Sequence, residues 1–492
     1  MDQAFHSKPG ILNSKLHILV FAAYAVTLTI TVVNHEPWMD EAQAWLLVQD
    51  TTPGELFAKY LRYEGSPGLW HLVLLVPAKL DLPYFTLNLI AAAISALGVW
   101  VFLSRAPFPL FAKILFPFSY FVFYQYGVVA RSYCLISVLL FWVAIQFKTK
   151  NERPLQFVLP VCLLAAVSVH TFLLAGGIIA VHLFDLLRDW PRLNVIEKKA
   201  HGLALALFAV TSLVIVVILA PPSDHFFGQE NNWSLVQFFN VASWAIPASL
   251  LLNEAGSFID IQRVISLAIF LVTIWWLKRR NLMLLYLLPL TLLLALFSVK
   301  YRNFWHDGIT FLLWVFALWI GFERRPVTPN KTLLDRAVPI LVTLVFGVHV
   351  FWAFYIVRND FLHSYSGSRE AAEYIKQHGL ENQSIFATGW KTAAVQPYFD
   401  QNVFYNYNDG APRRFWDWSM WNRTPLGMGS SVREQMHADR PDLVLIASDH
   451  LESPETPIPE GYRLEQVFVG YLFWKTGIFE FNTYWLLRRI DD

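Results

Sequence analysis

LHILVFAAYAVTLTITVV (residues 16–33) is an apolar run, and HEPWMDEAQAW (residues 35–45) follows it almost at once. A helix needs about 20 mostly apolar residues to cross the hydrocarbon of a membrane, so the run is long enough to be read as a first span. The second segment carries the adjacent acids Asp40 and Glu41. Carboxylates at the lip of a membrane are rarely needed to hold a helix bundle together. The pair therefore marks this loop as the first place to look for chemistry.

The composition places most of the chain in a membrane. Of 492 residues, 55% are hydrophobic and only 15% are charged, with a mean hydropathy of +0.42. Soluble domains carry about 25% charged residues. A net charge of +1 gives no case for nucleic-acid binding. Cys134 and Cys162 both lie in apolar stretches, which predicts neither a disulfide framework nor a cysteine metal site.

Apolar runs predict eleven spans, with the N-terminus inside and the C-terminus outside. Residues 67–79 are too short to cross and are predicted to form a dipping or interfacial helix. With that choice, every cluster of Lys and Arg between spans falls on the side of the N-terminus, as the positive-inside rule requires. The spans lie near 16–34, 84–104, 109–126, 128–147, 155–187 (two helices, divided at His170-Thr171), 201–220, 262–278, 281–298, 305–320 and 337–357.

Two domains follow from this division. Residues 1–357 are predicted to form an all-α polytopic membrane bundle whose first outer loop is 35–66. Residues 358–492 change in character and predict a soluble α/β domain outside the membrane. In this domain we expect a helix at 368–376 and strands at 384–388, 443–447 and 483–488.

Asp40, Glu41 and Glu64 are the candidate catalytic acids of the outer loop. Either acid of the pair could simply complement a helix dipole, and Glu64 could be a turn acid before Gly65-Ser-Pro-Gly68. In the functional interpretation, Asp40 is a general base that activates an acceptor hydroxyl, while Glu41 supports it. Glu64 would face Asp40 across the loop, and the two could share a divalent cation.

Several other residues are predicted to lie on the same outer face. Arg131 and Tyr133 head the fourth span, and Arg302 and His306 lie in a later outer turn. An arginine here could snorkel to lipid headgroups or bind a donor phosphate through its guanidinium fork. The residues predicted to contact the substrate are His170, Trp38 and His71.

Two further features leave alternatives open. The loop 221–261 is predicted to be an outer connector or a mobile lid, because it contains Pro221-Pro222 and Asn231-Asn232. The tryptophans of the C-terminal domain favour core packing over a carbohydrate-stacking surface. They are Trp390, Trp416, Trp418 and Trp421.

The outer-face pattern resembles that of the GT-C glycosyltransferases, in particular the branch with protein O-mannosyltransferases and the bacterial lipid A aminoarabinose transferase. The resemblance rests on the acid pair, on Tyr63-Glu-Gly-Ser-Pro-Gly-Leu69, on Arg131-Ser-Tyr133 and on His306-Asp-Gly308. It covers roughly residues 16–187, and 300–320 more weakly. Many bacterial relatives have Glu-Lys-Pro-Pro-Leu after the acid pair, whereas this chain lacks the lysine.

The resemblance implies a hexosyl- or pentosyltransferase of a bacterial inner membrane, with its C-terminal domain in the periplasm. The donor would be a polyprenyl-phosphate sugar and the acceptor a hydroxyl of a lipid, polysaccharide or protein. Transfer would invert the anomeric carbon, with Asp40 as base and Arg131, Tyr133, Arg302 and His306 on the donor phosphate. No cofactor beyond a divalent cation is implied. The main alternative is a transporter or flippase of a lipid-linked sugar, which would be expected to carry its charges near the bilayer midplane.

Overall fold

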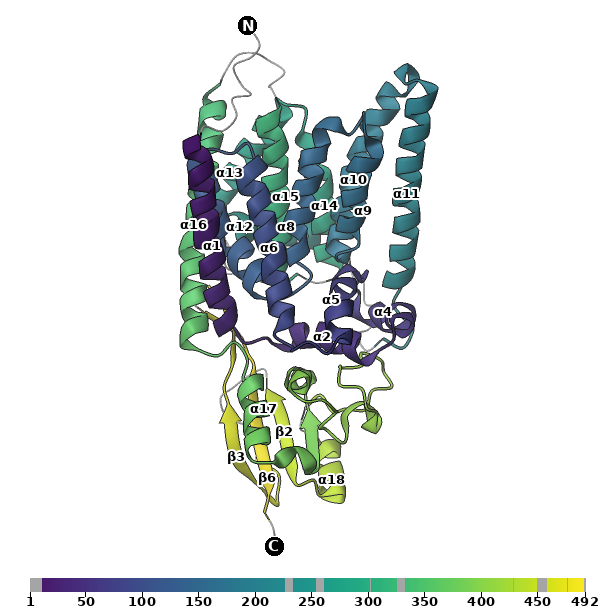
Figure 1. Ribbon diagram of the computed structural model, residues 1–492, viewed down its shortest axis with the longest axis vertical. Coiled ribbons are helices and arrows are strands. Elements are labelled where there is room, and N and C mark those ends of the chain that lie inside the picture. The colour runs from purple at the N-terminus through teal and green to yellow at the C-terminus, as the bar shows by residue number, and fades with distance from the viewer. Residues whose placement is uncertain are drawn as a thin grey trace.

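The computed structural model shows a helical bundle at one end of the molecule and a smaller α/β region at the other (Figure 1). The first outer loop lies between these two parts. The structure describes residues 11–225, 233–253, 261–300, 302–324, 332–427, 429–448, 458–475 and 477–490. The predicted loop 221–261 and the turn at 300–306 thus fall partly outside the described residues.

Seven helices in the described part of the chain are long and apolar enough to cross a membrane. α15 is the central one, because every residue from Phe304 to Gly321 is buried. A helix that is hydrophobic all round is stable only when other helices surround it. The seven helices are α1 (Ile11–Asn34), α6 (Thr86–Arg105), α10 (Val169–Asp189), α11 (Val195–Leu219), α13 (Ile261–Lys278), α15 (Phe304–Glu323) and α16 (Leu333–Leu362).

Shorter apolar helices account for most of the other predicted segments. The predicted dipping helix begins after Gly68, whose φ of 101° and close contact with the Leu61 side chain both require a glycine. The long run 155–187 forms two helices as predicted, but the break lies at 166–168, just before the predicted His170-Thr171, and the Ser168 hydroxyl accepts the Thr171 N–H to cap the second helix. These shorter helices are α5 (Leu69–Lys79), α8 (Cys134–Gln146), α9 (Pro154–Ala165), α12 (Leu235–Leu251) and α14 (Met283–Val299).

Two of the sequence-based predictions were wrong. The span at 109–126 is broken into α7 (Leu110–Leu115), the short η2 (Phe116–Phe118) and the π-helix η3 (Phe121–Val128). Pro117 lacks the N–H that a continuous helix would need at this point.

The loop 221–261 was also predicted wrongly, because it contains α12. This helix packs against α13, α14 and α15. The carbonyl oxygen of Leu250, near its carboxyl end, lies 3.2 Å from Nε2 of His349 in the middle of α16. The sequence interpretation predicted a loop because it gave more weight to the prolines and asparagines of the segment than to the 17 mostly apolar residues of α12.

Charged residues gather at the end of the bundle away from the α/β region. Arg280 pairs with Asp335 at 2.8 Å, and Lys148 pairs with Glu323 at 3.1 Å. Glu323 ends α15, and the opposite end of this helix contacts the α/β region through Phe304 and Trp474. The two ends of the bundle therefore differ in chemistry as the charge count predicts.

The first outer loop is helical and lies flat across the junction (Figure 1). The loop consists mainly of four short helical elements, one after another. They are α2 (Met39–Asp50), α3 (Pro53–Glu55), η1 (Leu56–Tyr60) and α4 (Leu61–Glu64).

The α/β region contains a mixed four-stranded sheet with the order β1-β2-β6-β3. β1 and β2 are parallel, and the remaining pairs are antiparallel. β4 and β5 form a separate antiparallel hairpin. The strands are β1 (Ile385–Thr388), β2 (Leu443–Ser448), β3 (Tyr462–Phe468), β4 (Tyr471–Trp474), β5 (Gly477–Phe481) and β6 (Thr483–Arg489). All three predicted strands and the helix at 368–376 are present.

Helices cover both faces of this sheet. Val444 and Ile446 pack with Val432 and Met436 of α18 (Ser430–Asp439). The alternate residues of β2 face the other way, since successive side chains of a strand point to opposite faces. That other face is covered by η7 (Trp390–Tyr398) and α17 (Ser368–Gln377), which begins where the chain leaves the bundle.

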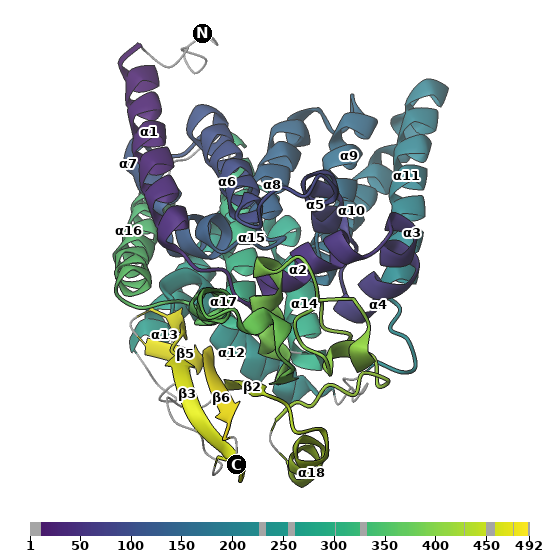
Figure 2. The same ribbon diagram turned by 60° about the horizontal axis from the view of Figure 1, so that its bottom comes forward.

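The α/β region is joined directly to the first outer loop. The Gln43 side chain donates to the Trp416 carbonyl and accepts the Trp416 N–H, each at 2.8 Å. Asp50 pairs with the buried Arg414 at 2.6 Å. η7 packs along α2, and Figure 2 shows the α/β region lying across that helix. The C-terminal part of the chain thus forms one wall of whatever site the loop contains.

Candidate functional site

The acids Asp40 and Glu41 diverge from the first turn of α2. The Asp40 carboxylate contacts the Arg131 guanidinium at 2.8 Å and keeps 26% of its side chain exposed. Glu41 is fully buried. Adjacent residues on a helix cannot face the same way, so one acid points to an accessible site and the other into the protein.

Glu41 holds the outer loop to the start of the fourth predicted span. One of its oxygens accepts the Ala130 N–H at 2.7 Å, and the other accepts the Trp38 N–H at 3.1 Å. His35 lies 3.5 Å from the same carboxyl group and 2.9 Å from Asp360. Burial lowers the pKa of His35, but these two acids outweigh burial and raise it to about 10. Glu41 therefore belongs to a buried ionic cluster that fixes the residue before Arg131.

Arg131 is enclosed by aromatic rings as well as paired with Asp40. Its guanidinium carbon lies 4.9 Å from the Trp305 ring centroid, 5.0 Å from that of Tyr133 and 6.0 Å from that of Trp38. Such rings attract the cation and exclude water. The predicted residues Trp38, Arg131 and Tyr133 are thus brought together. Trp305 was not singled out from the sequence, although its place beside His306 was a signal.

The predicted histidines join this cluster from two other helices. The His170 and His306 rings stack with centroids 4.2 Å apart. Nδ1 of His306 accepts the Asn303 N–H at 3.0 Å, and Nε2 lies 3.1 Å from both the Trp305 indole N–H and the Tyr133 hydroxyl. His170, His306 and Tyr133 therefore form one polar wall beside Arg131.

Arg302 is held by an acid that the sequence analysis did not consider. Its Nε and one terminal nitrogen each donate to Asp307 at 2.7 Å. This bidentate contact occupies the two N–H donors that could otherwise bind a phosphate. Arg302 is close to the cluster, but Arg131 is the arginine that faces the candidate base.

Glu64 faces the same region from the other end of the outer loop. Its carboxyl group accepts a hydrogen bond from Gln43 at 2.7 Å and has the Trp418 side chain as a further partner. Burial, together with the charges of Asp40 and Asp417, raises the pKa of Glu64 to about 8. Burial also raises the pKa of Asp40, against the opposing effect of Arg131. At neutral pH, Glu64 is therefore protonated and can donate a hydrogen bond.

The α/β region contributes a cation that the sequence did not reveal. Lys391 of η7 is buried, donates to the Phe481 carbonyl at 2.7 Å and pairs with Glu480. Its positive charge also acts on Asp40. Phe479, next to Glu480 on β5, packs on Trp305 with ring centroids 6.3 Å apart. The hairpin β4–β5 thus covers the cage of Arg131.

The C-terminal tryptophans divide between packing and exposure. Trp416 is buried against Trp418, whose side chain reaches Glu64. Trp421 is 74% exposed. Core packing thus explains Trp416, whereas Trp418 reaches the candidate site.

His71 and the predicted cation site are less well supported by the geometry. Among the described residues, no hydrogen bond, ion pair or ring contact joins the buried His71 to the outer-loop acids. The described residues also contain no group of three or more His, Cys, Asp or Glu side chains that could hold a metal ion. Both assignments stay predictions.

Comparison with known proteins reveals the fold but no sequence family. No protein-family model matches the chain, and no curated protein sequence matches it. Among solved structures, it is similar to the crystal structure of ArnT from Cupriavidus metallidurans in the apo state. The TM-score is 0.55 at 11% sequence identity, and the match covers 97% of this chain and 98% of that chain. The chain has an ArnT-like fold.

The ArnT-like fold confirms the predicted fold class, a polytopic helical bundle followed by an α/β region. The match runs along almost the whole chain, so it includes both parts of the molecule. At 11% identity it concerns the fold, and the chemistry must be argued from the site.

The arrangement offers three chemical capacities in one place. Asp40 is an accessible carboxylate for proton transfer. Arg131 is a cation held by aromatic rings for a developing negative charge. Glu64 is a protonated carboxyl group for hydrogen bonding to a substrate oxygen.

Proposed function

We propose that this protein is an integral membrane glycosyltransferase that moves a sugar from a polyprenyl-phosphate donor to an acceptor hydroxyl. The observation that carries the proposal is the contact between Asp40 and Arg131 at the lip of the bundle, within the ring of Trp38, Tyr133 and Trp305. The ArnT-like fold supports it. The site would face the periplasm of a bacterial inner membrane, with the N-terminus in the cytoplasm.

Asp40 would act as the general base. It takes the proton of the acceptor hydroxyl while that oxygen forms a bond to the anomeric carbon. The bond from this carbon to the phosphate oxygen breaks, and its electron pair leaves with the polyprenyl phosphate. Attack from the face opposite the phosphate inverts the anomeric carbon. The raised pKa of Asp40 makes it a stronger base than an exposed aspartate.

Arg131 would link the base to the leaving group. Without donor it neutralises Asp40, and with donor its positive charge would lie beside the phosphate as well. Negative charge grows on the phosphate as the bond breaks, so a fixed guanidinium stabilises the transition state more than the ground state. The His306–Tyr133 pair beside Arg131 would hold a further phosphate oxygen, whereas the Arg302 fork is occupied by Asp307.

Glu64 would orient the sugar or the acceptor by donating a hydrogen bond from its protonated carboxyl group. A divalent cation shared with Asp40 would compete with Arg131, which already contacts one Asp40 oxygen at 2.8 Å. The mechanism above runs on the side chains alone.

The test compares Asp40→Asn with wild-type protein in proteoliposomes. The probes are short-chain polyprenyl phosphates that each carry one hexose or pentose, and cell-envelope extract supplies the acceptor. Release of polyprenyl phosphate and labelling of the acceptor are measured together. We expect the variant to be slower by about 10²–10⁴-fold, the usual contribution of a general base.

The matched control is Asp81→Asn, at an exposed turn whose φ of 51° suits asparagine. It should retain wild-type turnover, and fluorescence-monitored melting should show both variants folded. Unchanged turnover in Asp40→Asn contradicts the base assignment. Movement of the intact donor across the bilayer without release of polyprenyl phosphate would instead identify a flippase.

A further inference from the structure

A cavity lies beside the connection between α1 and α2. It has a volume of about 470 Å³, within the range of small-molecule sites in proteins. Pro37 lines it, whereas the next residue, Trp38, lines the cage of Arg131. The cavity is therefore separate from the candidate catalytic site, although the same short segment borders both.

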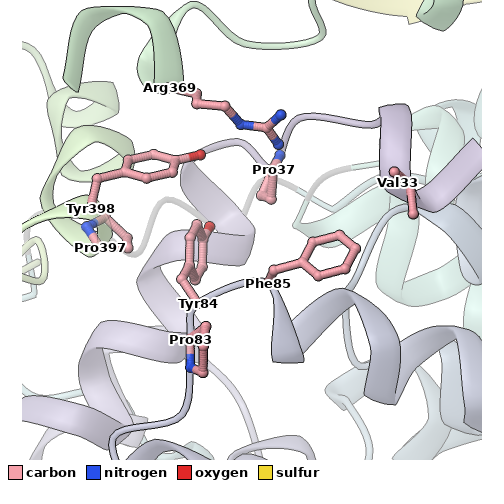
Figure 3. Close-up of a pocket in the computed structure, with 8 residues that line it drawn as sticks. All are labelled: Val33, Pro37, Pro83, Tyr84, Phe85, Arg369, Pro397 and Tyr398. Carbon is pink, nitrogen blue, oxygen red and sulfur yellow. The ribbon is translucent and has the colours of Figure 1, made fainter. Parts of the chain in front are cut away.

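The cavity has a polar end built from three side chains. Figure 3 shows the Arg369 guanidinium and the hydroxyl groups of Tyr84 and Tyr398 converging on one side of it. One Arg369 N–H donates to the His35 carbonyl at 3.2 Å, and the guanidinium also bonds to the Tyr398 side chain, so these two side chains form one polar group with five N–H donors and a hydroxyl. The Tyr84 hydroxyl is buried and has no hydrogen-bond partner among the described residues. A buried polar group of this kind usually has a partner, so a ligand oxygen here would complete its bonding.

The opposite end of the cavity is apolar and open toward the membrane. Val33 and Phe85 line it (Figure 3). Val33 is 59% exposed on the last turn of the membrane helix α1, and Phe85 immediately precedes the membrane helix α6. A hydrocarbon chain leaving the cavity at this point would pass into the hydrocarbon layer without crossing water.

The nearby acid, Glu36, has its own partners and also interacts with the charge of Arg369. The Glu36 carboxyl group accepts the Arg369 backbone N–H at 2.6 Å and a hydrogen bond from the Ser368 hydroxyl. It is thus engaged by the first turn of α17, and the Arg369 side chain extends away from that turn (Figure 3).

We propose that this cavity binds the head of a phosphate-headed lipid. The phosphate oxygens accept from the Arg369 guanidinium and from the Tyr84 hydroxyl, and the chain leaves past Phe85 and Val33. A volume of about 470 Å³ holds a headgroup and the first part of a chain, with the remainder in the bilayer. An isoprenoid phosphate and a glycerophospholipid share this chemistry.

The experiment measures lipid binding to the purified full-length protein in detergent. The Arg131→Gln background removes the cation of the candidate catalytic site, so binding there does not obscure the result. The probes are farnesyl phosphate and a short-chain phosphatidic acid, and the neutral controls are farnesol and the matching diacylglycerol. We expect at least one phosphate probe to bind about tenfold or more tightly than its neutral control, as a charge-assisted hydrogen bond implies.

Two variants test whether the phosphate probes bind in this cavity. Arg369→Gln should weaken phosphate binding about tenfold, whereas Lys376→Gln, which removes a charge from the exposed last turn of the same helix, should not. Val33→Trp changes an exposed side chain and should weaken binding by obstructing the apolar end.

Which phosphate binds more tightly identifies the source of the lipid. Equal binding of phosphate and neutral probes, or an unchanged Kd in Arg369→Gln, overturns the proposal. Neither result bears on sugar transfer at Asp40, since turnover is measured separately in protein with Arg131 intact.

Discussion

Asp40 and Glu41 are neighbours in the chain, yet they belong to different kinds of environment. Asp40 is about a quarter exposed and has one cation as its direct partner. Glu41 is buried and accepts hydrogen bonds from two backbone N–H groups on separate segments. The difference shows how one turn of helix can serve two purposes. Asp40 faces an accessible site, and Glu41 fixes the position of the segment that carries Arg131.

Replacing Glu41 should have the largest effect on stability. Glu41→Ala leaves the Ala130 and Trp38 N–H groups without their buried acceptor and removes one of the two acids beside the charged His35, at a cost of about 3 kcal/mol. The melting temperature of the purified protein, followed by tryptophan fluorescence, should fall by several degrees. Asp40→Asn should melt close to wild type. Equal losses of melting temperature in the two variants would show that the acids do not differ in this way.

Arg131→Lys should mainly affect the chemistry. Lysine keeps the charge but loses the planar fork and its stacking on Trp305 and Tyr133, so we expect about a tenfold to hundredfold loss of kcat/KM for the donor. Steady-state kinetics with varied donor measure it. Arg302→Lys is the matched control, because the Arg302 fork is already held by Asp307. A greater loss of kcat/KM in the control would indicate that Arg302, and not Arg131, contacts the phosphate.

Glu64 should produce the smallest effect, visible as a change in pH dependence. Its pKa of about 8 means that it loses its proton above that pH, so turnover should decline there if the protonated form is needed. Glu64→Gln cannot ionise and should lack this decline. A decline that persists in the variant would exclude Glu64 as its cause. Addition of EDTA at each pH tests the predicted cation, since loss of turnover that Mg²⁺ or Mn²⁺ restores would demonstrate a metal requirement.

Glu64 should also make the stability of the protein depend on pH, in a direction that its raised pKa determines. Between pH 4.5 and about 8 the folded protein keeps a proton on Glu64 that the unfolded chain releases. The free energy of unfolding therefore falls as pH rises through this window. Glu64→Gln should melt at a higher temperature relative to wild type at pH 8.5 than at pH 5.

Most of the fold could be predicted from local pattern. Hydrophobic length identified α1, α6 and α16, and short strand-like runs identified β1, β2 and β6 but not β3, β4 or β5, because both signals depend on neighbours in the chain. The helix α12 was missed because its flanking prolines and asparagines are typical of loops. The break before η3 was missed because Pro117 was not weighed against the apolar run around it.

The candidate site could be predicted only in part. Because Asp40, Glu64 and Arg131 lie near the ends of predicted spans, the sequence predicted that they share one face of the bundle. The effect of Lys391 on Asp40, and the capture of Arg302 by Asp307, depend on tertiary packing that no local pattern carries. Aromatic partners such as Trp305 follow from the same packing.

The hydrogen bonds between Gln43 and Trp416 have a consequence for biosynthesis. The two residues are 373 positions apart. At about 5–20 residues per second, a ribosome needs roughly 20–75 s to reach the second after making the first. During that interval α2 has its own helix but neither Trp416 nor Arg414 to hold it. Assembly of the outer loop is therefore a late event, and a nascent chain passes most of its synthesis without a finished candidate site.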